Sequence, residues 1–306
     1  TSNNGHQLWK SDGTASGTVM VTAINSGGTA NPGLHTDGFV VMNNNLYFSA
    51  DDGTNGVELW KSDGTASGTV MVKDITSGSA GSFSYTPAVK PVVMNNELYF
   101  NANDGNNGYE LWKSDGTASG TVMVKDIGPG GSFPQHLTVV GNTLYFDAND
   151  GTNGNELWKS DGTASGTVMV KDIAPTAGTS ASSPQYLTGI GNTLYFQATD
   201  GTNGIELWKS DGTASGTVMV QDINSGGSSS SPKYLTVVGN TLYFQAEDGT
   251  NGHELWKSDG TASGTVMVQD INSGGHGSSP KYLTVVGNTL YFSADDGTNG
   301  EELWKS

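Results

Sequence analysis

The stretch ELWKSDGTASGT, Glu156–Thr167, recurs almost letter for letter along the whole chain. The copies contain all seven tryptophans of the sequence, which are Trp9, Trp60, Trp112, Trp158, Trp208, Trp256 and Trp304. Successive tryptophans are 51, 52, 46, 50, 48 and 48 residues apart. A period in this range is typical of propellers and other repeat arrays. We therefore predict a single repeat domain over residues 1–306, with six repeats of about 46–52 residues.

Each repeat has the pattern of four short β-strands. In the third repeat, apolar runs cover residues 137–140, 144–148, 156–159 and 167–173, and turn-forming sequences such as Gly141-Asn142 separate them. Neighbouring apolar residues within one run, such as Leu157 and Trp158, indicate a sheet that is covered on both faces. A four-stranded unit of this size is marginal alone, so we expect neighbouring units to cover it, with the seven tryptophans packed between them.

Antiparallel four-stranded units that stack radially form a β-propeller, and we predict an all-β, six-bladed β-propeller. The chain contains 25 strand-like runs, because the tryptophan-bearing third run occurs seven times and the other three occur six times each. We expect the ring to close in a blade formed between residues 7–24 and 282–305, where 18–21 is the fourth strand. An open superhelix of the same units is the alternative. In the closed ring the run 7–10 is surplus, so it displaces 302–305, stays unpaired, or inserts into a neighbouring molecule, and the last of these predicts self-association.

Composition excludes several classes of function. The net charge is −17, and the 13 basic residues are all lysine, so a phosphate polyanion is repelled and nucleic acid is not an expected partner. The absence of cysteine excludes disulfides and thiolate metal sites. No run approaches the roughly 18 apolar residues of a membrane helix, so membrane insertion is not expected.

The repeat also resembles a known family. The sequence ELWKSDGTASGT, preceded in the third repeat by LYFDANDGTNG (Leu144–Gly154), is similar to the ELWxxDGTxxGT repeat of bacterial secreted proteins, which are also called hyalin-like. The resemblance covers the whole chain. It implies an extracellular or cell-surface protein of a family without an assigned enzymatic activity.

One recurring segment, Asp-Gly-Thr-Asn-Gly-x-Glu, has the oxygen side chains of a calcium site. Calcium prefers six to eight oxygen ligands, which Asp150, Asn153 and Glu156 supply in part. The alternative is that these are turn residues and that the glutamate accepts backbone hydrogen bonds. No other cofactor is expected. The candidate metal ligands are Asp52, Asn55, Glu58, Asp104, Asn107, Glu110, Asp150, Asn153, Glu156, Asp200, Asn203, Glu206, Asp248, Asn251, Glu254, Asp296, Asn299 and Glu302.

Variation between repeats concentrates on one predicted face. The links from the fourth strand to the next repeat differ in length and content, and so does the residue before each glutamate. In a meander these two positions emerge on the same face, where we place a candidate ligand surface. Its residues are Val57, Tyr109, Asn155, Ile205, His253 and Glu301. Lys159 recurs at every copy, and a pairing with Asp172 is expected at the blade edge.

Catalysis has little support in the sequence. The five histidines occupy variable positions, and a carboxylate pair such as Asp150 and Glu156 recurs in nearly identical settings. Acid and base roles require two carboxyls in different environments. We therefore predict a non-enzymatic structural or adhesive module that assembles into a surface fibre by strand exchange. The alternative is a multivalent, lectin-like module that binds glycans, and a hydrolase is the third reading.

Overall fold

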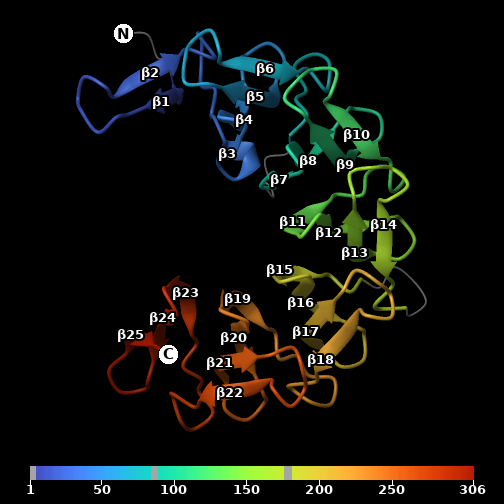
Figure 1. Ribbon diagram of the computed structural model, residues 1–306, viewed down its shortest axis with the longest axis vertical. Helices are drawn as coiled ribbons and strands as arrows, with labels where there is room; N and C mark the ends of the chain where they lie inside the picture. The colour runs from blue at the N-terminus through green and yellow to red at the C-terminus, as the bar shows by residue number, and fades with distance from the viewer. Residues whose placement is uncertain (1–4, 84–88, 176–180) are drawn as a thin grey trace. The chain divides into compact units, whose positions relative to one another are not determined.

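The structure is a computed structural model that describes residues 5–83, 89–175 and 181–306 (Figure 1). Within these residues it contains 25 strands and a single turn of 3₁₀ helix, η1 (Leu34–Thr36). The strands fall into four classes by their order in the repeat. The first strands are β3 (Val40–Met42), β7 (Val92–Met94), β11 (Gln135–Val140), β15 (Gln185–Ile190), β19 (Lys233–Val238) and β23 (Lys281–Val286). The second strands are β4 (Asn45–Asp51), β8 (Glu97–Asn103), β12 (Thr143–Asn149), β16 (Thr193–Thr199), β20 (Thr241–Glu247) and β24 (Thr289–Asp295).

The third and fourth strands carry the recurring tryptophan sequence and the run that follows it. The third strands are β1 (Leu8–Lys10), β5 (Val57–Ser62), β9 (Tyr109–Ser114), β13 (Asn155–Ser160), β17 (Ile205–Ser210), β21 (His253–Ser258) and β25 (Glu301–Lys305). The fourth strands are β2 (Val19–Thr22), β6 (Val70–Lys73), β10 (Val122–Lys125), β14 (Val168–Lys171), β18 (Val218–Gln221) and β22 (Val266–Gln269).

The strands form antiparallel sheets in the order of the chain. Five sheets have four strands each, which pair first to second, second to third and third to fourth. The predicted all-β class and the four-stranded meander are therefore confirmed. The chain divides into two compact units, and the division passes through the sheet β11–β14. Unit 1 contains β1 to β11, and unit 2 contains β14 to β25.

The first and last sheets have fewer strands than the others. In the described chain β1 and β2 form a two-stranded sheet, in which Trp9 lies opposite Met20, and β23, β24 and β25 form a three-stranded sheet. Residues 7–10, the seventh copy of the third-strand run, thus contain the partner strand of β2. The predicted blade between residues 7–24 and 282–305 stays a prediction.

The hairpin between first and second strands has the predicted turn chemistry. Asn43 and Asn44 both have positive φ, as in a type I′ turn, whereas Gly141 has positive φ as the first residue of a Gly-Asn turn. Asparagine and glycine tolerate this conformation better than other residues. These turns fix the register, so Val41 lies opposite Leu46 in the first of these hairpins.

The core lies between neighbouring sheets. In unit 1, Leu59 and Val72 of one sheet form a buried cluster with Phe100 and Trp112 of the next. In unit 2, Leu207 of one sheet packs in the same way with Trp256 of the next. Clusters of this kind cover the inner sheets, as the adjacent apolar residues predict, whereas the first and last sheets keep exposed apolar residues such as Trp9 and Leu303.

Candidate functional site

A buried glutamate is the second residue of the tryptophan strand in each of the five full-length repeats. Oε2 of Glu156 accepts hydrogen bonds from the backbone N–H of Ile173 at 3.0 Å and from the Ser182 hydroxyl at 2.6 Å, and Oε1 accepts from the Ser182 N–H at 2.9 Å. The glutamate thus ties its own strand to the end of the fourth strand and to the variable link. The same glutamate–serine pair occurs as Glu58 with Ser82, Glu110 with Ser132, Glu206 with Ser230 and Glu254 with Ser278.

Burial dominates the electrostatics of these carboxyls. It raises the pKa of Glu58 to about 7, although hydrogen bonds from Ser82 and the backbone oppose the shift. Burial also raises the pKa of Glu110, Glu156 and Glu206. The described structure gives these carboxyls the hydrogen-bonding role that the sequence offers as the alternative to calcium binding.

The first repeat replaces both members of this pair. Gln7 stands where the other repeats have glutamate, and Ala30 stands where they have serine. The Gln7 Oε1 still accepts from the Ile24 N–H at 2.9 Å, while its Nε2 donates to the carbonyls of Asn25 and Gly28. An amide supplies its own donor, so no serine hydroxyl is needed opposite it.

The aspartate and asparagine of the candidate metal loop bond to each other. Oδ1 of Asp200 accepts from the N–H groups of Thr202 and Asn203 at 2.8 Å, and its Oδ2 accepts from Asn203 Nδ2 at 2.7 Å. Equivalent aspartate–asparagine pairs occur at residues 52 and 55, 104 and 107, 248 and 251, and 296 and 299. The loop therefore brings the aspartate and asparagine together, while Glu206 belongs to the separate buried network.

No cluster of three or more histidines, aspartates or glutamates in the described residues has an arrangement that holds a metal ion. Glu302, in the last copy, lies exposed on β25. Calcium binding by the loops and its alternative, a purely structural turn, both stay predictions.

Five of the seven tryptophans are buried, namely Trp60, Trp112, Trp158, Trp208 and Trp256. Trp304 is partly buried, and its Nε1 donates to the Ala294 carbonyl at 3.0 Å. Trp9 departs from the predicted position between sheets, because it is 59 % exposed. In the described chain β1 pairs with β2 alone and has no strand of the second class on its other edge. The indole of Trp9 therefore lacks the cover that the other repeats provide.

Several of the recurring lysines join one repeat to the next, whereas Lys113 pairs with Glu97 of its own sheet at 3.0 Å. Lys159 Nζ donates to the carbonyl of Gly212 at 2.7 Å, and Lys171 Nζ donates to the carbonyl of Thr217 at 2.8 Å. Lys171 also lies over the ring of Trp208, 5.8 Å from its centroid. The expected pairing of Lys159 with Asp172 is therefore wrong, and these two lysines satisfy turn carbonyls of the following repeat.

The candidate ligand residues open the third strands, and each lies in its own sheet. Val57 is buried, Glu301 is exposed, and the other four are half-buried. The carbonyls of the first five accept N–H groups of the following link, as in the bond from Ser231 to Ile205 at 3.0 Å. Their side chains contact different neighbours: Tyr109 lies 5.6 Å from Phe133 between ring centroids, and His253 lies 3.5 Å from Glu247. Parts of two variable links, residues 84–88 and 176–180, lie outside the described residues.

A row of exposed tyrosines lies on the first strands of unit 2, and the sequence analysis missed it. The tyrosine row consists of Tyr186 on β15, Tyr234 on β19 and Tyr282 on β23. All three have positive φ, of 56°, 58° and 57°, at a point where the strand register shifts. The signal was present, because Ser-Pro-Gln/Lys-Tyr-Leu-Thr recurs at residues 183–188, 231–236 and 279–284.

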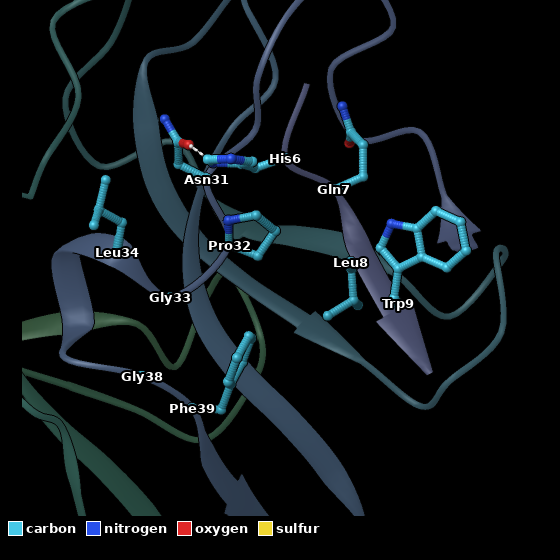
Figure 2. Close-up of a pocket in the computed structure, with 10 residues that line it drawn as sticks. All are labelled: His6, Gln7, Leu8, Trp9, Asn31, Pro32, Gly33, Leu34, Gly38 and Phe39. Carbon is cyan, nitrogen blue, oxygen red and sulfur yellow. Dashed lines mark hydrogen bonds between the residues drawn. The ribbon is translucent and has the colours of Figure 1, made fainter. Parts of the chain in front are cut away.

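A pocket of about 480 Å³ runs along β1 in unit 1 (Figure 2). Leu8 and Trp9 of β1 line it together with Pro32, Leu34 and Phe39 of the following link. Among its polar groups, His6 Nδ1 lies 3.1 Å from Asn31 Oδ1. The pocket is mainly apolar. It follows the edge of β1 that, in the complete sheets, pairs with a strand of the second class.

Among the described residues, none forms a helix of the length and apolarity that crossing a membrane requires. No protein-family model matches the chain, and no curated protein matches its sequence.

The chain is similar to several solved structures. A puromycin hydrolase mutant complexed with PGG is 14 % identical, with a TM-score of 0.50 over 94 % of this chain and 46 % of that one. A structure from an analysis of two prolyl endopeptidases is 16 % identical, with a TM-score of 0.51 over 87 % of this chain and 38 % of that one. The computationally designed Ika8 protein is 18 % identical, with a TM-score of 0.47 over 88 % of this chain and 70 % of that one.

The two peptidases are matched in their non-catalytic β-propeller domains. This chain spans less than half the length of either peptidase. At this level of identity the likeness concerns the fold alone, and it supports a propeller-type repeat module.

Proposed function

We propose that this chain is a non-enzymatic structural or adhesive module, located outside the cell or on its surface. In this proposal the six repeats form a six-bladed β-propeller, and copies of the chain join by strand exchange into a fibre. Similarity to the propeller domains of two peptidases supports the architecture. The resemblance to secreted ELWxxDGTxxGT repeats supports the location.

The observation that carries the non-enzymatic assignment is the glutamate–serine pair. Carboxylates such as Glu206 and Glu254 are buried, and their oxygens already accept hydrogen bonds from Ser230 and Ser278. The same arrangement recurs in five repeats. Catalytic acids and bases instead need distinct environments and access to a substrate. The recurring carboxylates therefore serve the architecture.

Strand exchange is supported by the edges of the first and last sheets. The sequence LYFSADDGTNG occurs identically at residues 46–56 and 290–300, so β24 carries the same residues that β4 uses to pair with β5. On β25, which β24 pairs with here, Leu303 is 77 % exposed. On β1, Leu8 is buried and Gln7 is fixed by hydrogen bonds to the following link. A pairing of β24 with β1 of another copy would cover Trp9 and supply β2 as a fourth strand.

The same strands are able to pair within one chain or between copies, as in domain swapping. Sedimentation velocity over a concentration series separates the two outcomes. We expect species larger than the 31.7 kDa chain to increase with concentration and with ionic strength, because salt screens the repulsion between copies of charge −17. Trp9→Ala is expected to weaken the association, and Phe133→Ala, which removes an exposed aromatic ring elsewhere, is the matched control. A chain that sediments as a monomer under all these conditions would contradict assembly.

A further inference from the structure

We propose that the tyrosine row of Tyr186, Tyr234 and Tyr282 is a binding platform for a neutral polysaccharide chain. The proposal goes beyond the assembly described above, because it concerns unit 2 and a different surface. It also moves the predicted glycan-binding surface away from the residues that precede the recurring glutamates.

The backbone of the row has positive φ, a conformation that recurs at the equivalent His136 of β11 (φ 53°) and therefore belongs to the bulge itself. Bulky residues rarely adopt positive φ, and such outliers concentrate at functional sites. In the neighbouring hairpins, where the chain needs positive φ only for a turn, it uses Gly191 and Gly239. The bulge thus accepts histidine or tyrosine, and the three first strands of unit 2 all carry tyrosine there, at positions 186, 234 and 282.

The β-bulge turns each tyrosine ring toward the surface. The register of β19 shifts between Lys233 and Thr236, which is the signature of a β-bulge, and bulges redirect side chains. Leu235, the next residue, packs against the buried cluster of its sheet, whereas Tyr234 is 39 % exposed. Tyr186 is 36 % exposed and Tyr282 76 % exposed. The bulge thus delivers the leucine to the core and the tyrosine to the surface.

A recurring hydrogen bond fixes the backbone that carries each ring. The Thr236 hydroxyl donates to the carbonyl of Tyr234 at 2.8 Å, and the same bond joins Thr188 to Tyr186 and Thr284 to Tyr282. The rings of Tyr186 and Tyr234 lie 6.4 Å apart with an interplanar angle of 59°. Because the two rings are tilted, they do not cover each other by stacking. A surface whose backbone is already fixed loses less entropy on binding.

The chemistry of the row selects the class of ligand. A tyrosine ring offers an apolar face and a polar hydroxyl, which matches the apolar C–H face and the hydroxyl rim of a sugar ring. The net charge of −17 disfavours polyanionic glycans. Equivalent rings on the first strands of successive repeats suit a repeating polymer, in which several weak contacts add up.

Isothermal titration calorimetry with neutral hexasaccharides of β-1,4-glucose, α-1,4-glucose and β-1,4-xylose tests the proposal, together with pull-down on insoluble cellulose and starch. The soluble and insoluble arms distinguish free oligosaccharide from matrix polysaccharide. We expect at least one of these probes to bind, and heparin, a polyanion, to show no binding. Absence of binding to every neutral probe would overturn the proposal.

The decisive variant is Tyr234→Asn. Asparagine adopts positive φ with little strain, so this change removes the ring and leaves the bulge. We expect affinity to fall by about tenfold or more while the thermal unfolding midpoint stays equal or rises. Phe133→Ala, which removes an exposed aromatic ring outside the row, is the matched control and is expected to bind normally. Unchanged affinity in Tyr234→Asn would overturn the proposal. Sedimentation of the same variants is expected to match that of the natural chain, so failure of this inference is separable from failure of assembly.

Discussion

The hydroxyl of Ser182 donates a 2.6 Å hydrogen bond to Oε2 of Glu156, across 26 residues of sequence that include one of the variable links. This contact shows how the array combines a constant framework with unequal links. The glutamate and serine are separated by 22, 24 or 26 residues in different repeats, yet each link returns a serine to the buried glutamate of its own repeat.

Loss of the serine hydroxyl is expected to destabilise the fold. Ser182→Ala leaves Glu156 with backbone donors alone, and an unsatisfied buried polar group costs about 1–3 kcal/mol. We expect the free energy of unfolding, measured by urea denaturation, to fall by an amount in this range. Ser165→Ala, at an exposed turn position, is the matched control and should change it little.

The first repeat leads to a second prediction about the glutamate–serine pair. Because Gln7 and Ala30 replace the pair there, Glu156→Gln combined with Ser182→Ala recreates a combination that the chain already uses. We expect the double variant to lose less stability than the sum of the two single variants. Losses that add fully would contradict a direct coupling between these two side chains.

Stability is expected to depend on pH through the buried glutamates. Burial raises the pKa of Glu58 to about 7 from the usual 4.5, so between these values the folded chain holds a proton that the unfolded chain releases. This contribution is fully present below about pH 4.5 and is lost as the pH rises through about 7. The pKa values of Glu110, Glu156 and Glu206 are raised as well, so they add to the same trend.

The free energy of unfolding should therefore fall from about pH 4.5 to about 7, and Glu58→Gln should make the slope shallower. The turn aspartates act in the opposite sense at lower pH. The Thr163 hydroxyl and backbone N–H lower the pKa of Asp161, so stability is lost as the pH falls through that lowered value. Stability that increases steadily from pH 4.5 to 7 would contradict this account.

Gly166, in the recurring turn, is expected to tolerate no larger residue without a loss of stability, because a Cβ has no room there. A Cβ on Gly166 would lie 2.1 Å from Oδ1 of Asp161, which is far inside any real contact. Gly166→Ala is expected to lower the free energy of unfolding by roughly 1–3 kcal/mol, as overpacking does. If the clash is the cause, adding Asp161→Ala should make the combined loss smaller than the sum. Fully additive losses would point to backbone conformation instead.

Calcium is expected to leave the stability unchanged. The oxygens of Asp200 already accept three hydrogen bonds within the loop, and Glu206 belongs to a separate network. Thermal unfolding in the presence of EDTA or of millimolar calcium should therefore give the same midpoint. An increase with calcium that Asp200→Asn abolishes would show that the loops bind the ion.

The sequence predicted the strands well because its period, its turns and its apolar runs are local signals. Leu157 and Trp158, on adjacent positions, indicated cover on both faces, and the buried clusters between sheets agree. The role of Lys159 could not be predicted in this way. Its partner is the carbonyl of Gly212, 53 residues away in the next repeat, and a backbone acceptor leaves no trace in the sequence.

The candidate site was harder to predict than the fold. Tyrosine has a strong preference for extended conformations, so nothing in its propensity indicates positive φ at Tyr186 or Tyr234. Trp9 shares its local sequence with the buried tryptophans, but in the described chain its strand pairs with β2 alone and has no strand of the second class on its other edge. In both cases the deciding contacts lie outside the local pattern.

Negative-stain electron microscopy over a range of protein concentrations and ionic strengths tests the central claim most directly. The natural chain is expected to form strings of joined particles that lengthen with concentration, and Trp9→Ala is expected to give mainly separate particles. Separate particles of the natural chain under every condition, or strings that are equally long in both proteins, would contradict a structural module that assembles through β1.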